Sequence, residues 1–219
     1  MPEWWTYSLS DFLMFSPRTY YRQIELYNLA IWPAQLAGAG IGAAILALLR
    51  RPSAQCSRVV AALLAVCWLW IAWAFHFERY AQISTGASWF AAAFALQAIL
   101  LVGLGVVAGQ AALRPADGPA GSIAIALVAL ALVAYPLLAP LTGRAWTTAE
   151  VFGVAADPTA IATGAALARV RGRMRWVFVA IPIAWCLVSA ATLGPMDAPE
   201  AWVVLAAAAL VLWVAVSKE

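Results

Sequence analysis

A set of polar and aromatic residues recurs at helical spacing early in the chain: Arg18, Tyr21, Glu25, Asn28, Trp32 and Gln35. At about 100° per residue, these side chains lie on one narrow face of a helix. A polar face on a membrane helix must meet protein or water rather than lipid. The stripe therefore predicts either hydrogen bonds between helices or one wall of a polar cavity. In the second interpretation Tyr21, Glu25, Asn28 and Gln35 line the cavity, and the carboxylate favours a cation or a proton.

A second group lies near residue 76, where an apolar segment ends. His76 is the only histidine of the chain, and its spacing to Arg79 and Tyr80 predicts one shared helix face. A metal site on one histidine needs carboxylates from other helices, such as Glu25 or Glu150. The surrounding aromatic residues are more typical of packing and of a belt at the membrane surface. His76 and Arg79 are nevertheless candidates for the cavity wall.

The third group surrounds Asp157 and Pro158. Thr147 and Glu150 fit a capping box that opens a helix. Asp157-Pro158 repeats a helix start ten residues later, with an N-cap residue followed by proline. Two starts so close together predict a broken helix, and broken helices build ion or substrate sites in transporters. Glu150, Asp157 and Thr159 are therefore candidate site residues, although a proline kink in one continuous span is the alternative.

These residues give little support for an enzymatic function. The single histidine has no nucleophile at a recognisable spacing, and no phosphate-binding loop is present. The three cysteines, Cys56, Cys67 and Cys186, form neither a CxxC motif nor an even set. The only lysine is Lys218, which excludes a retinal Schiff base on a buried lysine. We expect a protein that is not an enzyme, and the sequence indicates no particular cofactor or metal.

The elements that position these groups are membrane helices. The chain has 219 residues, of which 65% are hydrophobic and 11% are charged, whereas soluble domains are about 25% charged. A spanning helix needs about 20 mostly apolar residues. Such segments occupy residues 29–49, 59–77, 88–108, 122–141, 148–170, 176–193 and 202–216. The first is expected to belong to one long helix over residues 17–50, kinked at Pro33.

Basic residues predict the orientation of these segments. If segment 148–170 crosses the membrane, nine of the thirteen Lys and Arg residues lie on one side. Cytoplasmic loops carry such an excess. The sequence therefore predicts an all-α bundle of seven transmembrane helices, with the N-terminus outside and the C-terminus inside. Acidic residues gather on the outer side.

Two regions of unequal size follow from this pattern. Residues 1–16 are predicted to form an interfacial aromatic segment, without the basic start of a cleavable signal. Residues 17–219 are predicted to form a single transmembrane domain. Ser16 and Pro17 are expected to be the N-cap and first residue of its first helix. The small residues Ala34, Gly38 and Gly42 indicate close packing on that helix.

The run EWWTYSLSDF, followed by FSPRTYY and ELYN, resembles an uncharacterised bacterial family of polytopic membrane proteins. Residues 73–80 and 150–163 also look like that family, which has no established activity. The resemblance implies a multi-pass protein of the bacterial inner membrane. Relatives often carry Cys-Pro-Thr where this chain has Asp157-Pro158-Thr159, and this difference weakens the case for a metal site with a thiol ligand at residue 157.

These observations support two functional hypotheses. The first is a small transporter or channel-like protein for a cation, a proton or a small solute, with a polar cavity that faces the periplasm. The second is a non-catalytic accessory or assembly subunit of a larger membrane complex. The expected partners are the lipid bilayer and neighbouring membrane proteins or further copies of the chain, and no nucleic acid is expected.

Overall fold

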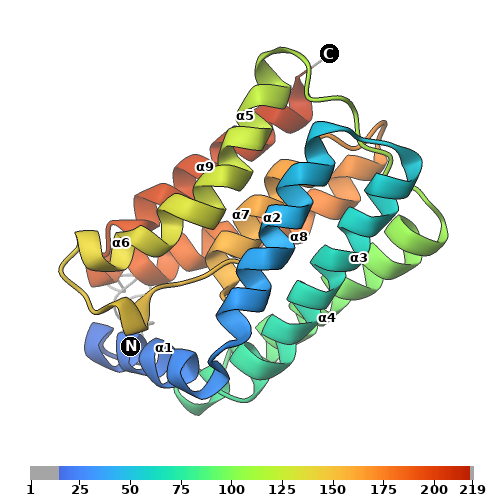
Figure 1. Cartoon of the computed structure of the whole chain (residues 1–219). Coiled ribbons are helices and arrows are strands. Elements are labelled where there is room, and N and C mark those ends of the chain that lie inside the picture. Colours follow the sequence, from blue (N-terminus) through green and yellow to red (C-terminus); the bar gives the residue numbers. More distant parts are fainter. Residues whose placement is uncertain (1–14, 218–219) are drawn as a thin grey trace, which may run out of the picture.

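The computed structural model describes residues 15–217 and is all-helical over them (Figure 1). The α-helices are α1 (Pro17–Ile31), α2 (Ala34–Arg50), α3 (Ala54–Trp70), α4 (Ala87–Leu100), α5 (Gly118–Ala129), α6 (Tyr135–Leu141), α7 (Ala156–Leu167), α8 (Met174–Leu193) and α9 (Glu200–Val216). Turns of π-helix extend α3 and α4 and join α5 to α6. The aromatic segment predicted over residues 1–16 lies almost wholly outside the described residues.

Several of these helices are able to cross a membrane. Within residues 15–217, four continuous helical segments are long and apolar enough: Ala54–Gln82, Ala87–Val107, Gly118–Leu141 and Met174–Met196. A fifth results if the bent pair α1 and α2 counts as one span, and α9 is a shorter apolar helix. The apolar composition therefore produces a membrane-type bundle, as the sequence predicts.

The first predicted helix is two helices in the structure. Ser16 does cap α1, because its hydroxyl oxygen accepts from the Thr19 backbone N–H at 3.2 Å. The predicted interruption at Pro33 is confirmed, but the prediction of one helix over residues 17–50 is wrong, because α1 and α2 meet at an angle of 89°. Pro33 lies at the break after a cis peptide bond, and proline has no N–H to continue a helix. Helix α1 consequently lies across one end of the bundle, while α2 runs along it (Figure 1).

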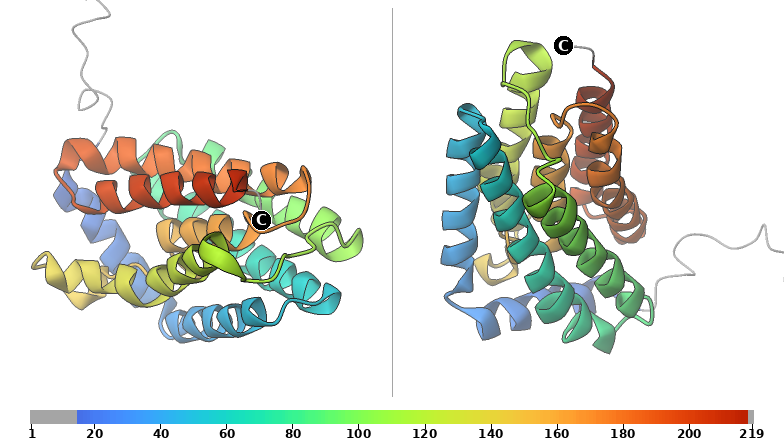
Figure 2. Two further views of the ribbon diagram at one scale, coloured as in Figure 1. Left: turned by 90° about the horizontal axis from the view of Figure 1, so that it is seen from above. Right: turned by 90° about the vertical axis from the view of Figure 1, so that its right-hand side faces the viewer.

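Helix α7 forms the centre of the bundle. Each of its twelve residues is buried, and its neighbours are α3, α5, α8 and α9. Figure 2 shows helices around it in both further views. A side chain on Gly164 would approach the Val211 methyl groups to 3.2 Å, so the small residue permits the contact with α9.

The two ends of the bundle differ in charge. At one end, α2 and α7 finish and α3, α5 and α8 begin; we call this the Arg169 end, because Arg169 contacts the Leu49 and Arg114 carbonyl oxygens there. Its arginines are Arg50, Arg51, Arg58, Arg114, Arg169, Arg171, Arg173 and Arg175. The opposite end, where α7 begins, is the Asp157 end. It carries Glu25, Glu78, Glu150, Asp157, Asp197 and Glu200.

Candidate functional site

Asp157 is a carboxylate enclosed by protein at the start of α7. Its side chain belongs to a residue that is 2% exposed. The Tyr135 and Ser189 hydroxyls each donate to Oδ2 at 2.7 Å, and the Trp185 indole N–H donates to Oδ1 at 2.7 Å. Three neutral donors from α6 and α8 therefore converge on one buried acid, a group that is expensive to bury without such partners.

The residues directly before α7 do not form a helix. The predicted capping box of Thr147 and Glu150 is wrong, because residues 149–155 are not helical. Asp157 is not the N-cap either: Ala155 occupies that position with an extended backbone, and Asp157 lies in the first turn. Segment 148–170 is thus a non-helical stretch followed by a short helix. Such backbone is stable in a membrane only where protein or water surrounds it.

Hydrogen bonds from α1 hold the non-helical stretch. The Asn28 amide donates to the Thr147 and Ala149 carbonyl oxygens at 2.8 and 2.9 Å. The Tyr27 hydroxyl donates to the Val154 carbonyl oxygen at 2.8 Å. The Thr159 hydroxyl oxygen accepts from the Gly153 backbone N–H at 2.8 Å. Asn28 and Thr159 therefore position the segment that leads to Asp157.

A close backbone contact completes this support. Gly153 has φ +86°, and a Cβ built on it would lie 2.9 Å from the Gly38 Cα atom. A Cβ on Gly38 would lie only 2.4 Å from the Phe152 carbonyl oxygen. The small residue predicted to mark a packing face on α2 thus packs against the non-helical stretch before α7.

His76 lies next to this site in an aromatic enclosure. Its ring centroid is 4.5 Å from that of Phe94 and 4.8 Å from that of Trp185, the residue that donates to Asp157. The imidazole is fully buried, and neither ring nitrogen has a hydrogen-bond partner among the described residues. Of the predicted shared face, the Tyr80 ring lies 6.0 Å from the His76 ring between centroids, whereas the half-buried Arg79 follows the π-helical turn at Ile71–Phe77 and lines a different hollow.

Tyr21 and Glu25 line a separate hollow at the surface of the Asp157 end. The hollow has a volume of about 760 Å³ and also contacts Thr148. Glu25 accepts from Arg22 at 2.6 Å. The Arg144 guanidinium lies 4.1 Å from the centre of the Tyr21 ring and forms an ion pair with the buried Glu200. The ion pair of Arg144 and Glu200 thus lies beside this hollow.

The structure brings together only part of the predicted set. Asp157, Thr159 and His76 are buried around the start of α7, and Glu150 lies on the non-helical stretch before Asp157. Gln35 donates to the Asn28 carbonyl oxygen at 2.8 Å, which bridges the bend between α1 and α2. Arg79 lines a different hollow with Glu78 and Gln82.

Sequence reasoning missed the donors to Asp157. Trp185 and Ser189 are four residues apart on α8, so they share one helix face. A polar pair at that spacing in an apolar helix is a signal that points to a buried polar partner. Tyr135, from α6, and the ion pair of Arg144 with Glu200 have no comparable local signal.

Comparison with known proteins places the chain in a family. No curated protein and no solved structure matches it. A family model described as a family of unknown function, DUF6064, matches residues 18–219, which is almost all of the part of the chain that the structure describes. The buried Asp157 site and the bend between α1 and α2 both lie within the matched region, and the chain belongs to the DUF6064 family.

Proposed function

We propose that the protein is a small membrane transporter for a proton or another cation, and that Asp157 is its proton-binding residue. The observation that carries the proposal is a carboxylate buried in an apolar bundle and held by three neutral donors. Ionisable groups inside membrane bundles are costly and commonly belong to proton relays or ion pathways.

The chemistry of the site fits reversible protonation. Three hydrogen bonds stabilise the carboxylate, while protonation removes a charge that is costly at this depth. A carboxyl group at the start of a helix also interacts favourably with the partial positive charge of the helix N-terminus. The surroundings of Asp157 therefore support both of its protonation states, as a carrier of protons requires.

The position of the site suggests a route from the surface. The hollow lined by Tyr21 and Glu25 opens at the Asp157 end, and Arg144 contacts Tyr21 there. Glu150 lies along the chain between Thr148, which lines this hollow, and Asp157. Movement of the Arg144–Glu200 pair away from Tyr21 would join the hollow to the buried acid.

The topology that suits this function has seven crossings. In this arrangement α2, α3, α4, α5 with α6, the stretch 149–170, α8 and α9 each cross the bilayer once. The Arg169 end faces the cytoplasm because of its arginines, so the N-terminus and the Asp157 end face the periplasm. We further propose a location in the bacterial inner membrane, which the family resemblance of the sequence implies.

Proton flux into proteoliposomes tests the proposal. The purified chain is expected to dissipate an imposed pH gradient faster than empty liposomes do, and Asp157→Asn is expected to abolish that flux. Asp197→Asn is the matched control, because it makes the same change at an exposed residue in a left-handed conformation that asparagine tolerates. Wild-type flux equal to that of empty liposomes, for protons and common cations, would refute the proposal.

A second candidate function is that of an accessory or assembly subunit. Large aromatic side chains on the outer surface favour it, since Trp89 is 79% and Trp202 is 75% exposed. Such rings pack against lipid or against neighbouring membrane proteins. Purification in a gentle detergent separates the two functions: a co-purifying chain in fixed ratio supports the subunit, and a monomer or homo-oligomer with flux supports the transporter.

A further inference from the structure

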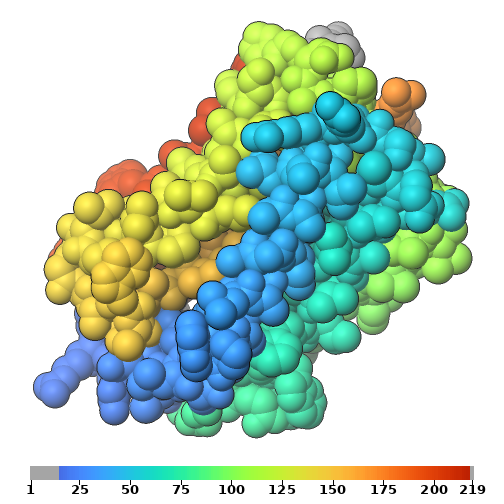
Figure 3. Space-filling model, viewed as in Figure 1, coloured from blue at the N-terminus to red at the C-terminus, as the bar shows by residue number. Residues whose placement is uncertain are grey.

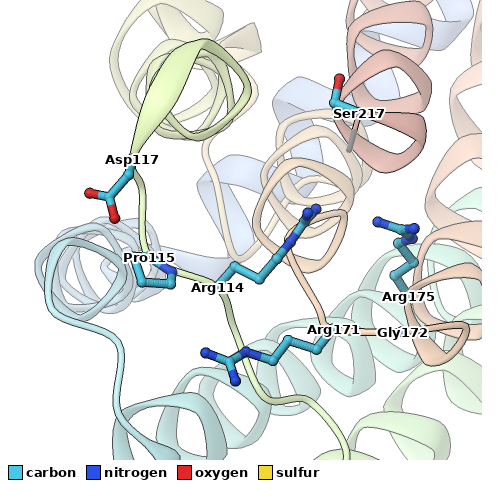
Figure 4. Close-up of a pocket in the computed structure, with 7 residues that line it drawn as sticks. All are labelled: Arg114, Pro115, Asp117, Arg171, Gly172, Arg175 and Ser217. Carbon is cyan, nitrogen blue, oxygen red and sulfur yellow. The ribbon is translucent and has the colours of Figure 1, made fainter. Parts of the chain in front are cut away.

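The Arg169 end contains a pocket that is lined mainly by positive charge. Its volume is about 610 Å³, and its walls are formed by Arg114, Pro115, Asp117, Arg171, Gly172, Arg175 and Ser217. Figure 4 shows the guanidinium groups of Arg114 and Arg175 pointing into the same space below Ser217. Arg171 extends along another wall, and the Asp117 carboxylate points away from the two guanidinium groups (Figure 4).

Backbone pairing holds these arginines in place. Leu113 and Val170 form an antiparallel bridge. The Arg114 N–H donates to the Arg169 carbonyl oxygen at 2.9 Å, and the Arg171 N–H donates to the Ala112 carbonyl oxygen at 3.0 Å. Gly172 then turns the chain with φ +70°. Backbone hydrogen bonds thus join two segments, residues 112–114 and 169–171, that are far apart in the sequence. This pairing brings the arginines of both segments to one pocket.

The electrostatics of the pocket favour an anion. Three guanidinium groups line it against one carboxylate, and like charges at close range repel. The Arg175 Nε atom is shielded from solvent and has no hydrogen-bond partner among the described residues. Arg175 also lies in the first turn of α8, where the helix dipole adds positive potential. A bound anion would relieve the repulsion and accept the hydrogen bonds that the guanidinium groups can donate.

We propose that this pocket binds a phosphate group. The planar guanidinium groups of Arg114 and Arg175 match phosphate oxygens in paired hydrogen bonds. The pocket lies beside Trp176 and near Trp213, half-exposed rings of the kind found at the headgroup level of a bilayer. The phosphate can come from an anionic lipid headgroup or from a soluble phosphate. The inference is independent of proton transport at Asp157.

Lipid retention in native mass spectrometry tests the site with the full-length chain. Wild type is expected to retain phosphatidylglycerol over phosphatidylcholine, and Arg175→Gln to lower that retention by about tenfold. Arg51→Gln is the matched control, because Arg51 is exposed at the same end and lies outside the pocket. Arg171→Gln, at an exposed pocket residue, is expected to lower retention less and serves if Arg175→Gln does not fold.

Inorganic phosphate distinguishes the two sources. If millimolar phosphate raises the Tm of wild type but not of Arg175→Gln, and lipid retention is unselective, a soluble phosphate is the ligand. If phosphate has no effect while phosphatidylglycerol is retained selectively, a lipid headgroup is the ligand. Equal binding of both probes by wild type, Arg175→Gln and Arg171→Gln overturns the proposal.

Discussion

Single residues at the two ends of α7 carry opposite buried charges. Asp157 lies in its first turn, and Arg169 follows two residues after its last residue, Leu167. Both are 2% exposed. An acid near the N-terminus and a base near the C-terminus of a helix both interact favourably with its dipole. The two residues therefore stabilise a short helix that is buried along its whole length.

The Arg169 side chain links the end of α7 to two neighbouring segments. Its guanidinium donates to the Leu49 carbonyl oxygen at 3.3 Å and to the Arg114 carbonyl oxygen at 2.5 Å. Arg169→Gln removes these donors and leaves buried carbonyl groups short of partners. We expect a loss of about 2–3 kcal/mol in the free energy of unfolding, measured by denaturant titration in detergent. Arg173→Gln, at an exposed arginine, should have little effect; equal losses in both variants would contradict the role of Arg169.

Among the elements, α2 lies in close contact with the stretch 149–155 that leads into α7. Gly38 on α2 lies against the Phe152 carbonyl group and the Gly153 backbone. Helix α2 can approach the Phe152–Gly153 backbone this closely only because residue 38 is a glycine. Figure 3 shows α2 running across this face of the molecule between the α3–α4 side and the α5–α6 side.

Alanine substitutions at two glycines of α2, Gly38 and Gly40, test this contact. Gly38→Ala places a Cβ 2.4 Å from the Phe152 carbonyl oxygen, so the stretch before Asp157 must shift. We expect a loss of about 1–3 kcal/mol together with lower proton flux. A Cβ on Gly40 meets nothing within 4 Å, and Gly40→Ala should be neutral or stabilising by up to about 1 kcal/mol. Thermal unfolding of both variants checks this, and equal behaviour of the two would count against the contact.

In the whole molecule, the two ends of the bundle differ in charge and in their exposed tryptophans. Five strongly exposed tryptophans lie at the Asp157 end: Trp32, Trp73, Trp89, Trp146 and Trp202. Two less exposed ones, Trp176 and Trp213, lie toward the Arg169 end. Tryptophan is enriched at both membrane surfaces. These positions suit a bilayer that surrounds the bundle between its two ends.

Cysteine labelling tests the proposed seven crossings and their orientation. In a Cys56→Ser background, where Cys67 and Cys186 are buried, single cysteines are introduced as Ala145→Cys and Arg173→Cys. Both positions are exposed and flank stretch 149–170. A membrane-impermeant maleimide should label Ala145→Cys in intact cells and Arg173→Cys only after permeabilisation. Labelling of both from one side would show that stretch 149–170 does not cross.

Local sequence signals are sufficient to predict part of the fold. The apolar composition predicts membrane helices, and the Ser16-Pro17 pair predicts the start of α1, which the structure confirms. Pro33 marks the end of α1, but proline indicates only that a helix is interrupted and not the angle at which the chain continues. The 89° bend depends on where α1 finds partners such as Thr147 and Ala149.

The amino-acid sequence is thus enough to predict apolar helices long enough to cross a membrane, the charge difference between their ends and the family resemblance. Composition and periodicity act over a few residues, so these properties can be read locally. The meeting of Tyr135, Trp185 and Ser189 at Asp157 is seen only in the folded chain, because these residues lie 22, 28 and 32 residues from Asp157 along the sequence. Contacts at such separations depend on how whole helices pack, and no local pattern specifies that packing.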